Sequence, residues 1–379
     1  MKIALISSEK LPVPPIRGGA VQQYINGVLP YLRKKHEITI LSIQDPELKE
    51  MEVVEQVRYI RIPGDTKEKF FKEAARELKL NNYDIVHVFN RPVSLKRYFK
   101  ASPHSKFILS VHNEMFTPKK IPYTQAVECI KRVSQIVTIS DFIQCGILKN
   151  FPEAAGKIRT IYSGVDLEQF QPVWSEQAIK IREQVKNEYG INNSNVVLYV
   201  SRFSPKKGSH LVLQAMSDVI QENPQTVLLV VGSKWYGSNK VDEYVSYIYK
   251  LGQKISGHVI FTGFIPPADI YKYFTVGDIF VCASQWEEPL ARVHYEAMAA
   301  GLPIITTNRG GNPEVVKGFG NGLVLTGYDY SEDFAAAINY LLRNPNLARE
   351  MGRNGRRLAE DRFSYKRVAE DLLRLYEEI

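Results

Sequence analysis

The sequence has few cysteines and lacks any long apolar run. Its three cysteines, Cys129, Cys145 and Cys282, form no Cys-x-x-Cys pair or Cys/His cluster, so we expect neither a disulfide framework nor a zinc site. No uninterrupted apolar segment approaches the roughly 20 residues that a membrane-spanning helix needs. The first apolar stretch is too short for a secretion signal and is followed by no small-residue cleavage site. These absences predict a cytoplasmic globular protein without a transmembrane segment.

Length and composition indicate a folded protein of two domains. At roughly 100 to 200 residues per domain, two domains are expected for a chain of 379 residues. The 24 glycines and 20 prolines are ordinary usage, which excludes collagen-like and low-complexity classes.

Positive charge is concentrated in the first half of the chain. Residues 1–163 hold 26 Lys and Arg against 16 Asp and Glu, whereas residues 164–379 hold 23 against 25. This asymmetry favours an anionic partner for the first half, such as an acidic acceptor molecule, a membrane surface or a nucleic acid, with a solvated basic face as the equal alternative. No stripe of basic residues interleaved with aromatics is present there, so we expect no nucleic-acid partner.

Short runs rich in Val, Ile and Leu recur along the chain and predict strands buried on both faces. In the first half they fall at residues 2–7, 37–43, 84–89, 106–111, 135–140 and 157–162. Segments with helical spacing lie between them, at residues 20–33, 67–80 and 122–133. The pattern restarts after Gly190, with strands at residues 195–201, 226–232, 258–263, 278–283 and 303–307. This alternation predicts an α/β fold with two Rossmann-like, doubly wound parallel-sheet domains.

The domain boundary is expected where the last strand of the first half gives way to turn residues. Residues 162–166 and 170–172 show no helical period and include Gly164 and Pro172. We therefore place the first domain at residues 1–165 and the second at residues 166–363. A last helix over residues 365–379 follows two other helices and could cap either domain.

In doubly wound sheets, ligands bind beyond the carboxyl ends of the strands, so the loops at those ends are the candidate sites. Gly18-Gly19 precedes a helix, and bare backbone N–H groups at a helix start suit a phosphate, although a plain glycine turn is the more common explanation for such a pair taken alone. Arg202 follows the first strand of the second half, and Lys207 comes five residues later at a helix start. These two cations could converge on one diphosphate, with a solvated basic loop as the alternative.

Glu288 and Glu296 lie in a segment that is expected to run from strand to helix. Pro289 fits the first helical position, which places Glu288 at the cap and Glu296 about two turns inside the helix. The spacing alone is weak, because the chain has four Glu pairs eight residues apart. Carboxylates in a cleft suit sugar hydroxyls, since an ionised carboxylate accepts hydrogen bonds from them.

Two further loops complete the set. Gly310-Gly311 precedes a short helix after the strand at residues 303–307. His112 directly follows the strand at residues 106–111. A lone histidine is more often structural than catalytic, but its place at the carboxyl end of a strand favours a functional role.

Taken in order, these features resemble retaining glycosyltransferase family 4, whose members have the GT-B fold of two Rossmann-like domains facing across a cleft. The resemblance covers nearly the full length. It implies a retaining hexosyltransferase that moves a sugar from a nucleotide-diphosphate sugar, in the first instance a UDP-sugar, to an acceptor hydroxyl. It also implies that residues 1–165 form the acceptor-side domain, that residues 166–363 bind the donor, and that the helix at about residues 364–379 crosses back to the first domain.

The resemblance assigns the donor diphosphate to Arg202 and Lys207, helped by the backbone N–H group of Gly19. Further backbone N–H groups in the segment after Pro289 would assist them, at Leu290, Ala291 and Arg292. The family usually has Phe-Gly where this chain has Leu290-Ala291, and Arg292 stands where the family is commonly apolar. The added Cβ narrows the approach to the phosphates, so the donor's identity does not follow from the resemblance.

The resemblance assigns the rest of the donor to four residues. Glu296 would hold the ribose, and Phe264 matches the position where the base meets the backbone. Glu288 would bind the 3- and 4-hydroxyls of the donor sugar and His112 the sugar near C6, which makes these two the catalytic candidates.

No Asp-x-Asp triplet occurs in the chain, so the metal-bridged diphosphate of the other large glycosyltransferase fold is not supported. We expect no metal and no cofactor, because Arg202, Lys207 and helix N-termini can neutralise the diphosphate. Retention by double displacement would need a carboxylate nucleophile, for which Glu114 and Glu288 are the candidates. The resemblance implies instead a front-face attack in which the departing phosphate oxygen accepts the acceptor's proton.

The acceptor is expected at the basic first half. Together with Gly18, basic residues around the strand end that bears His112 are predicted to face it, namely Lys96, Arg97, Lys100, Lys106, Lys119 and Lys120. Such a surface favours an anionic acceptor or one held at an anionic surface, such as a phosphate-bearing glycan or a lipid headgroup, with peripheral membrane contact.

Two alternatives stay open. A sugar-nucleotide epimerase of the same fold would use His112 and Glu114 as acid and base and would convert its substrate without an acceptor. A coat or scaffold protein would keep the fold for binding alone, but would not need both the basic pair and the glutamate pair. Residues 9–14 and 288–296 are most similar to family members of endospore-forming bacteria that belong to the spore coat, which implies a spore-coat or cell-surface glycan and incorporation into the coat.

Overall fold

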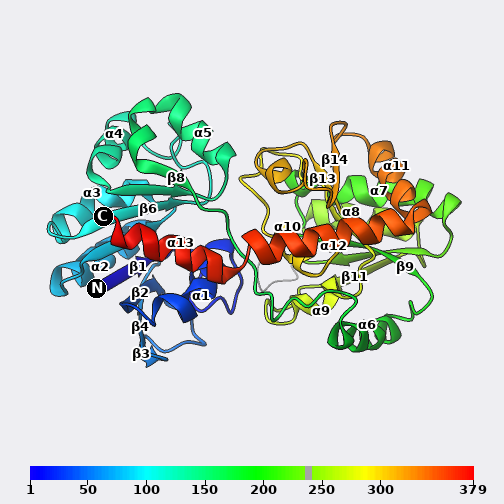
Figure 1. Ribbon diagram of the computed structural model, residues 1–379, viewed down its shortest axis with the longest axis horizontal. Coiled ribbons are helices and arrows are strands. Elements are labelled where there is room, and N and C mark those ends of the chain that lie inside the picture. The colour runs from blue at the N-terminus through cyan, green and yellow to red at the C-terminus, as the bar shows by residue number, and fades with distance from the viewer. Residues whose placement is uncertain (235–240) are drawn as a thin grey trace. The chain divides into compact units, whose positions relative to one another are not determined.

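The structure is a computed structural model that describes residues 1–234 and 241–379. It divides into two compact units (Figure 1). Unit 1 comprises Met1–Gly164 with Tyr365–Ile379, and unit 2 comprises Val165–Ser364. Each unit is an α/β structure around a mainly parallel sheet, as predicted.

Every residue of unit 1 is described, and its sheet has the strand order β3-β4-β2-β1-β5-β6-β7-β8. Neighbouring strands are parallel except β3 and β4, which form an antiparallel pair at the sheet edge. The strands are β1 (Lys2–Ile6), β2 (Glu37–Ile43), β3 (Met51–Val54), β4 (Val57–Ile62), β5 (Ile85–Phe89), β6 (Lys106–Val111), β7 (Gln135–Thr138) and β8 (Ile158–Thr160).

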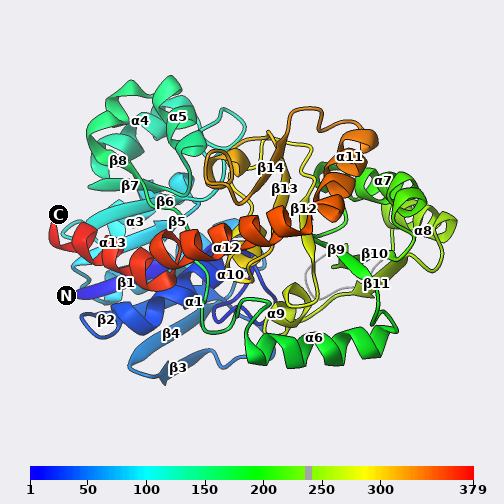
Figure 2. The ribbon, with the colours of Figure 1, turned by 45° about the vertical axis from the view of Figure 1, so that its right-hand side comes forward.

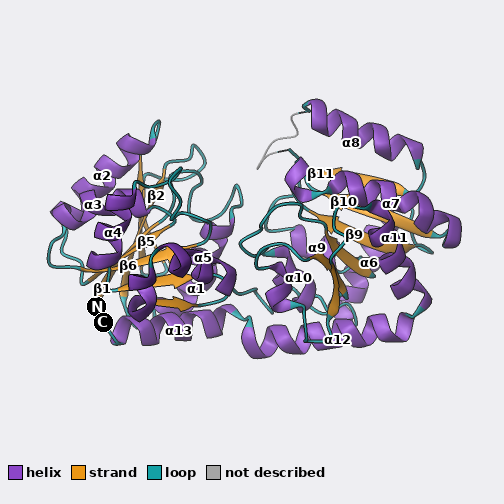
Figure 3. Cartoon of the chain, turned by 90° about the horizontal axis from the view of Figure 1, so that it is seen from above, coloured by secondary structure: helices purple, strands orange, loops and turns teal. Residues whose placement is uncertain are grey.

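Helices cover both faces of the unit 1 sheet (Figure 3). Side chains of α2 to α5 form one core with the sheet, and side chains of α1 and α13 form the other. The C-terminal helix α13 lies beside α1 (Figures 1 and 2), and Tyr365 lies against Gly27, where a Cβ atom would have no room. The helices are α1 (Ala20–Leu32), α2 (Lys67–Leu80), α3 (Pro92–Ala101), α4 (Tyr123–Arg132), α5 (Asp141–Asn150), α13 (Tyr365–Glu377) and the short 3-10 helix η1 (Pro152–Lys157).

The described part of unit 2 has a sheet with the strand order β11-β10-β9-β12-β13-β14, and all of its neighbours are parallel. This order changes direction beside β9, because β10 and β12 flank it on either side. The strands are β9 (Asn195–Val200), β10 (Thr226–Val231), β11 (Val259–Gly263), β12 (Ile279–Cys282), β13 (Ile304–Thr307) and β14 (Gly322–Leu325).

Helices also lie on both faces of the unit 2 sheet (Figure 3). Contacts group α7 with α8 and α11 in one layer, and α10 with α12 and α9 with α6 in the other. The helices are α6 (Glu176–Tyr189), α7 (Ser209–Glu222), α8 (Glu243–Lys254), α9 (Ile270–Phe274), α10 (Val293–Ala299), α11 (Ser331–Arg343), α12 (Pro345–Arg362) and the 3-10 helices η2 (Pro205–Lys207) and η3 (Asn312–Val315).

Two details of the predicted fold are wrong. The unit 1 sheet is not wholly parallel, because the unpredicted hairpin of β3 and β4 closes its edge through Glu55 and Gln56, both at positive φ. The helix predicted to begin at Pro289 begins at Val293. Contacts of the backbone before Val293 with the loop after β13 account for this later start, as described below.

Candidate active site

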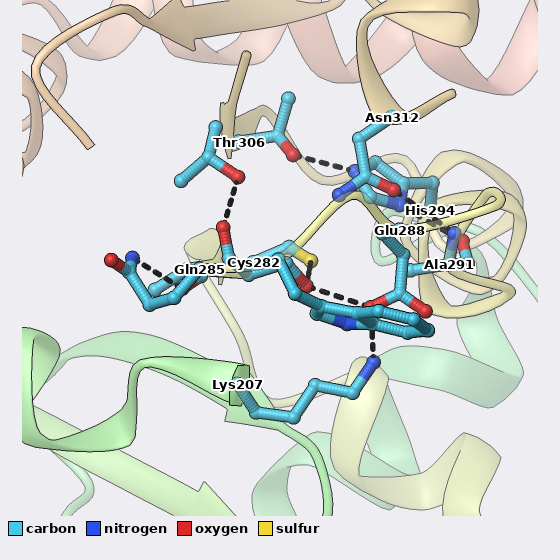
Figure 4. A network of polar contacts seen from close by, with 12 residues as sticks. Lys207, Cys282, Gln285, Glu288, Ala291, His294, Thr306 and Asn312 are labelled. Carbon is cyan, nitrogen blue, oxygen red and sulfur yellow. Dashed lines mark hydrogen bonds and ion pairs between the residues drawn. The ribbon is translucent and has the colours of Figure 1, made fainter. Parts of the chain in front are cut away.

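The site in unit 2 is built around an ion pair between Lys207 and Glu288. Lys207 ends η2, just beyond β9, and Glu288 lies beyond the neighbouring strand β12, so both follow carboxyl ends of adjacent strands. Lys207 Nζ lies 2.5 Å from Glu288 Oε2 (Figure 4). Both side chains are largely buried. Gly208 has φ +69° and sits so close to the end of β12 that a Cβ atom would lie 2.0 Å from the carbonyl oxygen of Ala283. This close approach brings the Lys207 loop to Glu288.

Glu288 is held in its ionised form. Burial alone would raise the pKa of its carboxyl group, but attraction to Lys207 and hydrogen bonds from Lys207, Trp286 and Ser284 outweigh burial and lower the pKa. Trp286 Nε1 donates to Glu288 Oε2 at 2.7 Å, and Ser284 Oγ donates to the same oxygen at 3.0 Å. The result is a fixed carboxylate at the sheet edge where ligands of such folds bind.

The loop after β13 clamps the segment that carries Glu288. Gly310 has φ +59°, and a Cβ atom there would lie 1.9 Å from the backbone oxygen of Glu288. The Gly311 N–H donates to that oxygen at 2.8 Å, and the Gly310 N–H donates to Glu287 Oε2 at 2.7 Å. Glycine is therefore required at position 310 for both conformation and space.

The backbone just before α10 is bound to side chains instead of being helical. The Ala291 N–H donates to Asn312 Oδ1 at 3.0 Å, while His294 contacts Ala291 O through Nδ1 at 2.9 Å and Thr306 Oγ1 through Nε2 at 2.8 Å (Figure 4). Burial lowers the pKa of His294 to about 4, so the ring is neutral at pH 7. The Ala291 N–H, which was predicted to face the diphosphate, is thus already taken by Asn312.

Glu296 lies in the first turn of α10, not two turns inside it as predicted. Its buried carboxylate pairs with Arg292. Burial raises the pKa of Glu296, and Arg292 counteracts only part of this effect. The structure thus brings together two residues that were assigned to different parts of the donor, ribose and diphosphate.

Arg202 and Phe264 also lie at the carboxyl edge of the unit 2 sheet. Arg202 follows β9 by two residues, and Phe264 directly follows β11. Leu290 is buried in the loop between Glu288 and α10. The predicted donor residues of unit 2 therefore share one sheet edge, while their individual roles stay predictions.

In unit 1, Gly18 and Gly19 form the turn into α1, with φ +91° and +101°. Gly19 is the N-cap residue, and a Cβ atom there would meet Gln22 Oε1 at 2.3 Å. The Gln22 amide in turn donates to Ser7, Ser8 and the Leu11 carbonyl, so it ties the loop to the end of β1. The Gly18 N–H is already used, since it donates to the Pro15 carbonyl at 2.8 Å, so of the two glycines only Gly19 fits the phosphate-site prediction.

His112 is a neutral, buried imidazole at the carboxyl end of β6. Burial lowers its pKa to about 3. The ring packs edge-on against Tyr24, with centroids 4.9 Å apart, and lies 5.8 Å from the ring of Phe89. Its backbone N–H donates to Asn90 Oδ1 at 2.6 Å, and its Nε2 has no hydrogen-bond partner in the described structure. An unsatisfied buried nitrogen is uncommon and suits a ligand hydroxyl.

The basic residues predicted to face the acceptor are not all at the same edge. Lys119 is exposed in the loop after β6, near the strand end that bears His112, and so is Lys120. Lys106 opens β6 and therefore lies at the opposite edge of the sheet, so its predicted place beside His112 is wrong. On α3, Lys96 pairs with Glu128, and Arg97 pairs with Glu68.

Several residues near the predicted site residues of the two units were not predicted from the sequence. Glu9 and Arg91 form a largely buried ion pair beyond β1 and at the start of α3, with Nε to Oε2 at 2.5 Å. Asn312 follows the recognised Gly310-Gly311, and Trp286 precedes the recognised Glu288. For Asn312 and Trp286, the one signal in the sequence is that each lies next to a predicted site residue, because neither asparagine nor tryptophan by itself indicates a function.

Residues 1–234 and 241–379 contain no candidate metal cluster and no candidate membrane span. Within them, no group of three or more His, Cys, Asp and Glu is placed to hold a metal ion. No helix there has the length and apolar character needed to cross a bilayer.

Comparison with known proteins places these sites in a class. Residues 18–169 match the model of Glycosyltransferase Family 4, and residues 181–358 match that of Glycosyl transferases group 1. Solved structures of the GT-B type share the fold of both units: Anabaena HepE in complex with UDP aligns with a TM-score of 0.79 and 22% identity over 100% of both chains, and a HepE complex with UDP-glucose aligns equally well. The chain is therefore a glycosyltransferase of the GT-B type.

Full-length relatives define the family more closely. The chain is 47% identical over 377 residues to spore coat protein SA of Bacillus subtilis, covering 100% of this chain and 99% of that protein. It is 44% identical to the putative glycosyltransferase YtcC of the same organism, covering 100% and 92%. The chain belongs to glycosyltransferase family 4, and the predicted resemblance, including its closer likeness to a spore-coat member, is confirmed.

Proposed function

We propose that the protein transfers a hexose from a UDP-sugar to an acceptor hydroxyl, with retention of configuration and without a metal ion. The observation that carries this proposal is the buried Lys207–Glu288 pair at the carboxyl ends of β9 and β12. It couples a cation suited to a diphosphate with a carboxylate suited to sugar hydroxyls. Structural neighbours named for their complexes with UDP and UDP-glucose support a uridine nucleotide.

Unit 2 would bind the donor. Lys207 and Arg202 would neutralise the diphosphate, and the fixed positive end of α1 behind Gly19 would add backbone N–H groups. Such charges are present before the reaction starts and need no reorganisation as the leaving phosphate gains charge. Glu296 would bind the ribose, Phe264 would lie at the base, and Glu288 would bind the sugar.

Unit 1 would supply His112 and the acceptor surface. A neutral imidazole with a free Nε2 can exchange a hydrogen bond with a sugar hydroxyl without adding positive charge near the anomeric carbon. In a front-face reaction, the bond from C1 to the phosphate oxygen breaks while the acceptor oxygen bonds to C1 on the same face. The departing phosphate oxygen then takes the acceptor's proton, so no protein nucleophile is required.

We further propose that the product is a spore-coat or cell-surface glycan and that the acceptor is anionic or held at an anionic surface. The name of the 47% identical relative supports the first statement. The excess of basic residues in the first 163 residues supports the second.

A thermal-shift screen of nucleotide sugars in EDTA tests the proposal. A ligand at one hundred times its dissociation constant stabilises the folded state by about 2.7 kcal/mol. We expect UDP-hexoses to raise the melting temperature with EDTA present, and no other nucleotide class to do so more strongly. Incubating the best UDP-hexose without an acceptor should leave its sugar unchanged, whereas an epimerase would convert it. A protein that keeps the fold only for assembly and binds no nucleotide sugar would show no thermal shift.

A further inference from the structure

Trp286 has no role in the assignments above, yet it contacts the centre of the site. Its indole Nε1 donates to Glu288 Oε2 at 2.7 Å. Lys206 Nζ lies 5.0 Å from the indole ring centroid, within the range of a cation–π interaction. The Gln285 N–H next to it donates to Lys206 O at 2.8 Å, so the loop after β9 holds this tryptophan in place.

One oxygen of the Glu288 carboxylate is fully occupied. Lys207 Nζ, Ser284 Oγ and Trp286 Nε1 all donate to Oε2, at 2.5, 3.0 and 2.7 Å. Each carboxylate oxygen accepts about two hydrogen bonds, so a fourth donor has no place there. No residue in the described structure donates to Oε1, which leaves this oxygen as the acceptor for a ligand.

The three groups that donate hydrogen bonds to Oε2 should respond differently when the UDP-hexose binds. Lys207 is a cation that a diphosphate would attract, so its bond to Glu288 is the one most open to change. Trp286 is a neutral donor on a rigid ring, and its N–H has no acceptor role. It can therefore keep Oε2 in place while Lys207 is shared with the phosphates.

We propose that Trp286 is a positioning residue that keeps Glu288 Oε2 occupied, so that the donor sugar is read by Oε1 alone. The inference rests on the proposed function and names its substrate class more closely: a UDP-hexose with a free hydroxyl at the position that meets Oε1. A sugar that lacks this hydroxyl cannot donate to Oε1 of this largely buried carboxylate, and sites built to bind a substrate hydroxyl reject such analogues strongly.

The test compares Trp286→Phe with the wild-type protein. Phenylalanine keeps an aromatic ring beneath Lys206 but removes the N–H group. The probes are UDP, the UDP-hexose that stabilises the wild type best, and the 3-deoxy and 4-deoxy analogues of that UDP-hexose. Trp174→Phe is the matched control, because the Trp174 indole is also in unit 2 but lies against Gly301.

In Trp286→Phe we expect UDP affinity within about twofold of wild type and a loss of about tenfold or more in affinity for the UDP-hexose, the range of one charge-assisted hydrogen bond. The preference for the UDP-hexose over its deoxy analogues should shrink by a similar factor. Trp174→Phe should keep both the affinity and the preference. Ser284→Ala, which removes another donor to Oε2, should reduce the same preference and provides a second variant if Trp286→Phe fails to fold.

Three results would overturn the inference. An unchanged preference in both Trp286→Phe and Ser284→Ala would show that Oε2 needs no such occupation. An equal loss of affinity for UDP and UDP-hexose in Trp286→Phe would indicate a merely structural tryptophan. If the folded wild type binds UDP but no UDP-hexose, the proposed function itself is wrong. The first two results, in contrast, would contradict only the role of Trp286.

Discussion

Lys207 and Glu288 form a charge pair whose members depend on each other. Their side chains are 19% and 10% exposed, so removing one partner leaves the other as a poorly solvated charge. We expect Lys207→Ala to lower the free energy of unfolding by about 3 kcal/mol in a denaturant titration. Lys180, whose side chain is 69% exposed in its pair with Glu176, is the matched control, and Lys180→Ala should cost less than about 0.5 kcal/mol. Equal costs for the two variants would mean that the Lys207–Glu288 pair is not buried in solution.

Alanine substitutions of Glu288 and Glu296 should affect binding and turnover differently. Glu296→Ala is expected to weaken binding of free UDP and of a UDP-hexose alike, because its assigned partner, the ribose, is present in both ligands. Glu288→Ala should spare UDP and lower turnover, because its assigned partner is the sugar. Calorimetric titrations with both ligands measure the difference. If both variants lose UDP affinity equally, the assigned roles are wrong.

The loop after β13 holds the backbone of Glu288 in place through the hydrogen bond from the Gly311 N–H to the Glu288 carbonyl. Gly310→Ala would place a Cβ atom against the Glu288 carbonyl and strain a backbone at φ +59°. Gly318 also has positive φ, at +85°, but a Cβ atom there would meet nothing within 4 Å. We expect Gly310→Ala to abolish measurable UDP-hexose binding, while Gly318→Ala lowers stability slightly and binds normally. Normal binding by Gly310→Ala would show that this loop does not shape the donor site.

Helix α10 should make the protein sensitive to acid. His294 has its pKa lowered to about 4 by burial, against about 6.5 in an unfolded chain. As pH falls through 6.5, the unfolded chain takes up a proton that the folded chain does not, so stability is lost between about pH 6.5 and 4. His87 and His112, with pKa lowered to about 3, extend this loss further.

His294→Gln removes one of these linked groups, so its melting temperature should fall less steeply between pH 7 and 4 than that of the wild type. The exposed His104 provides the control, and His104→Gln should keep the wild-type slope. A slope in His294→Gln as steep as that of the wild type would contradict the burial of a neutral His294.

The sequence predicts best the strands that contain a long run of buried apolar residues. Residues 196–200 of β9 and 227–231 of β10 are all apolar and buried, and the predicted bounds of these strands differ from the structure by one residue. Strand β3 is largely exposed, and its turn at Glu55 and Gln56 carries no glycine or asparagine signal, so nothing in the pattern marked it. The helix start at Pro289 was mispredicted because a proline fits both a loop and a first helical turn. The backbone of residues 288–291 instead bonds with residues 311 and 312, a contact between distant segments that local spacing does not reveal.

At the scale of the whole molecule, the charge excess belongs mainly to unit 1. The returning segment 365–379 adds three basic and four acidic residues and leaves that excess in place. Attraction between exposed charges is screened over about 8 Å at physiological ionic strength. With an anionic acceptor, the acceptor KM should therefore rise with salt, while the KM for the UDP-hexose, held by buried charges, should change less.

Lys119 and Lys120 are the residues to substitute in testing this prediction, because both are exposed at the edge of the unit 1 sheet that bears His112. Lys119/Lys120→Gln should raise the acceptor KM and weaken its salt dependence. Lys34/Lys35→Gln is the control, since these exposed lysines follow α1 and precede β2, at the opposite edge of the sheet. If the acceptor KM is insensitive to salt and unchanged in both variants, the basic surface is only solvated.

In the proposed function, unit 2 binds a UDP-hexose through cations of the chain. Calorimetric titration of the UDP-hexose in excess EDTA, into wild type, Lys207→Ala and Lys180→Ala, tests it most directly. We expect the wild type and Lys180→Ala to bind with equal affinity and Lys207→Ala to lose about tenfold or more, as expected for one charge-assisted contact. Wild-type affinity in Lys207→Ala, or loss of all binding when EDTA is added, would contradict it.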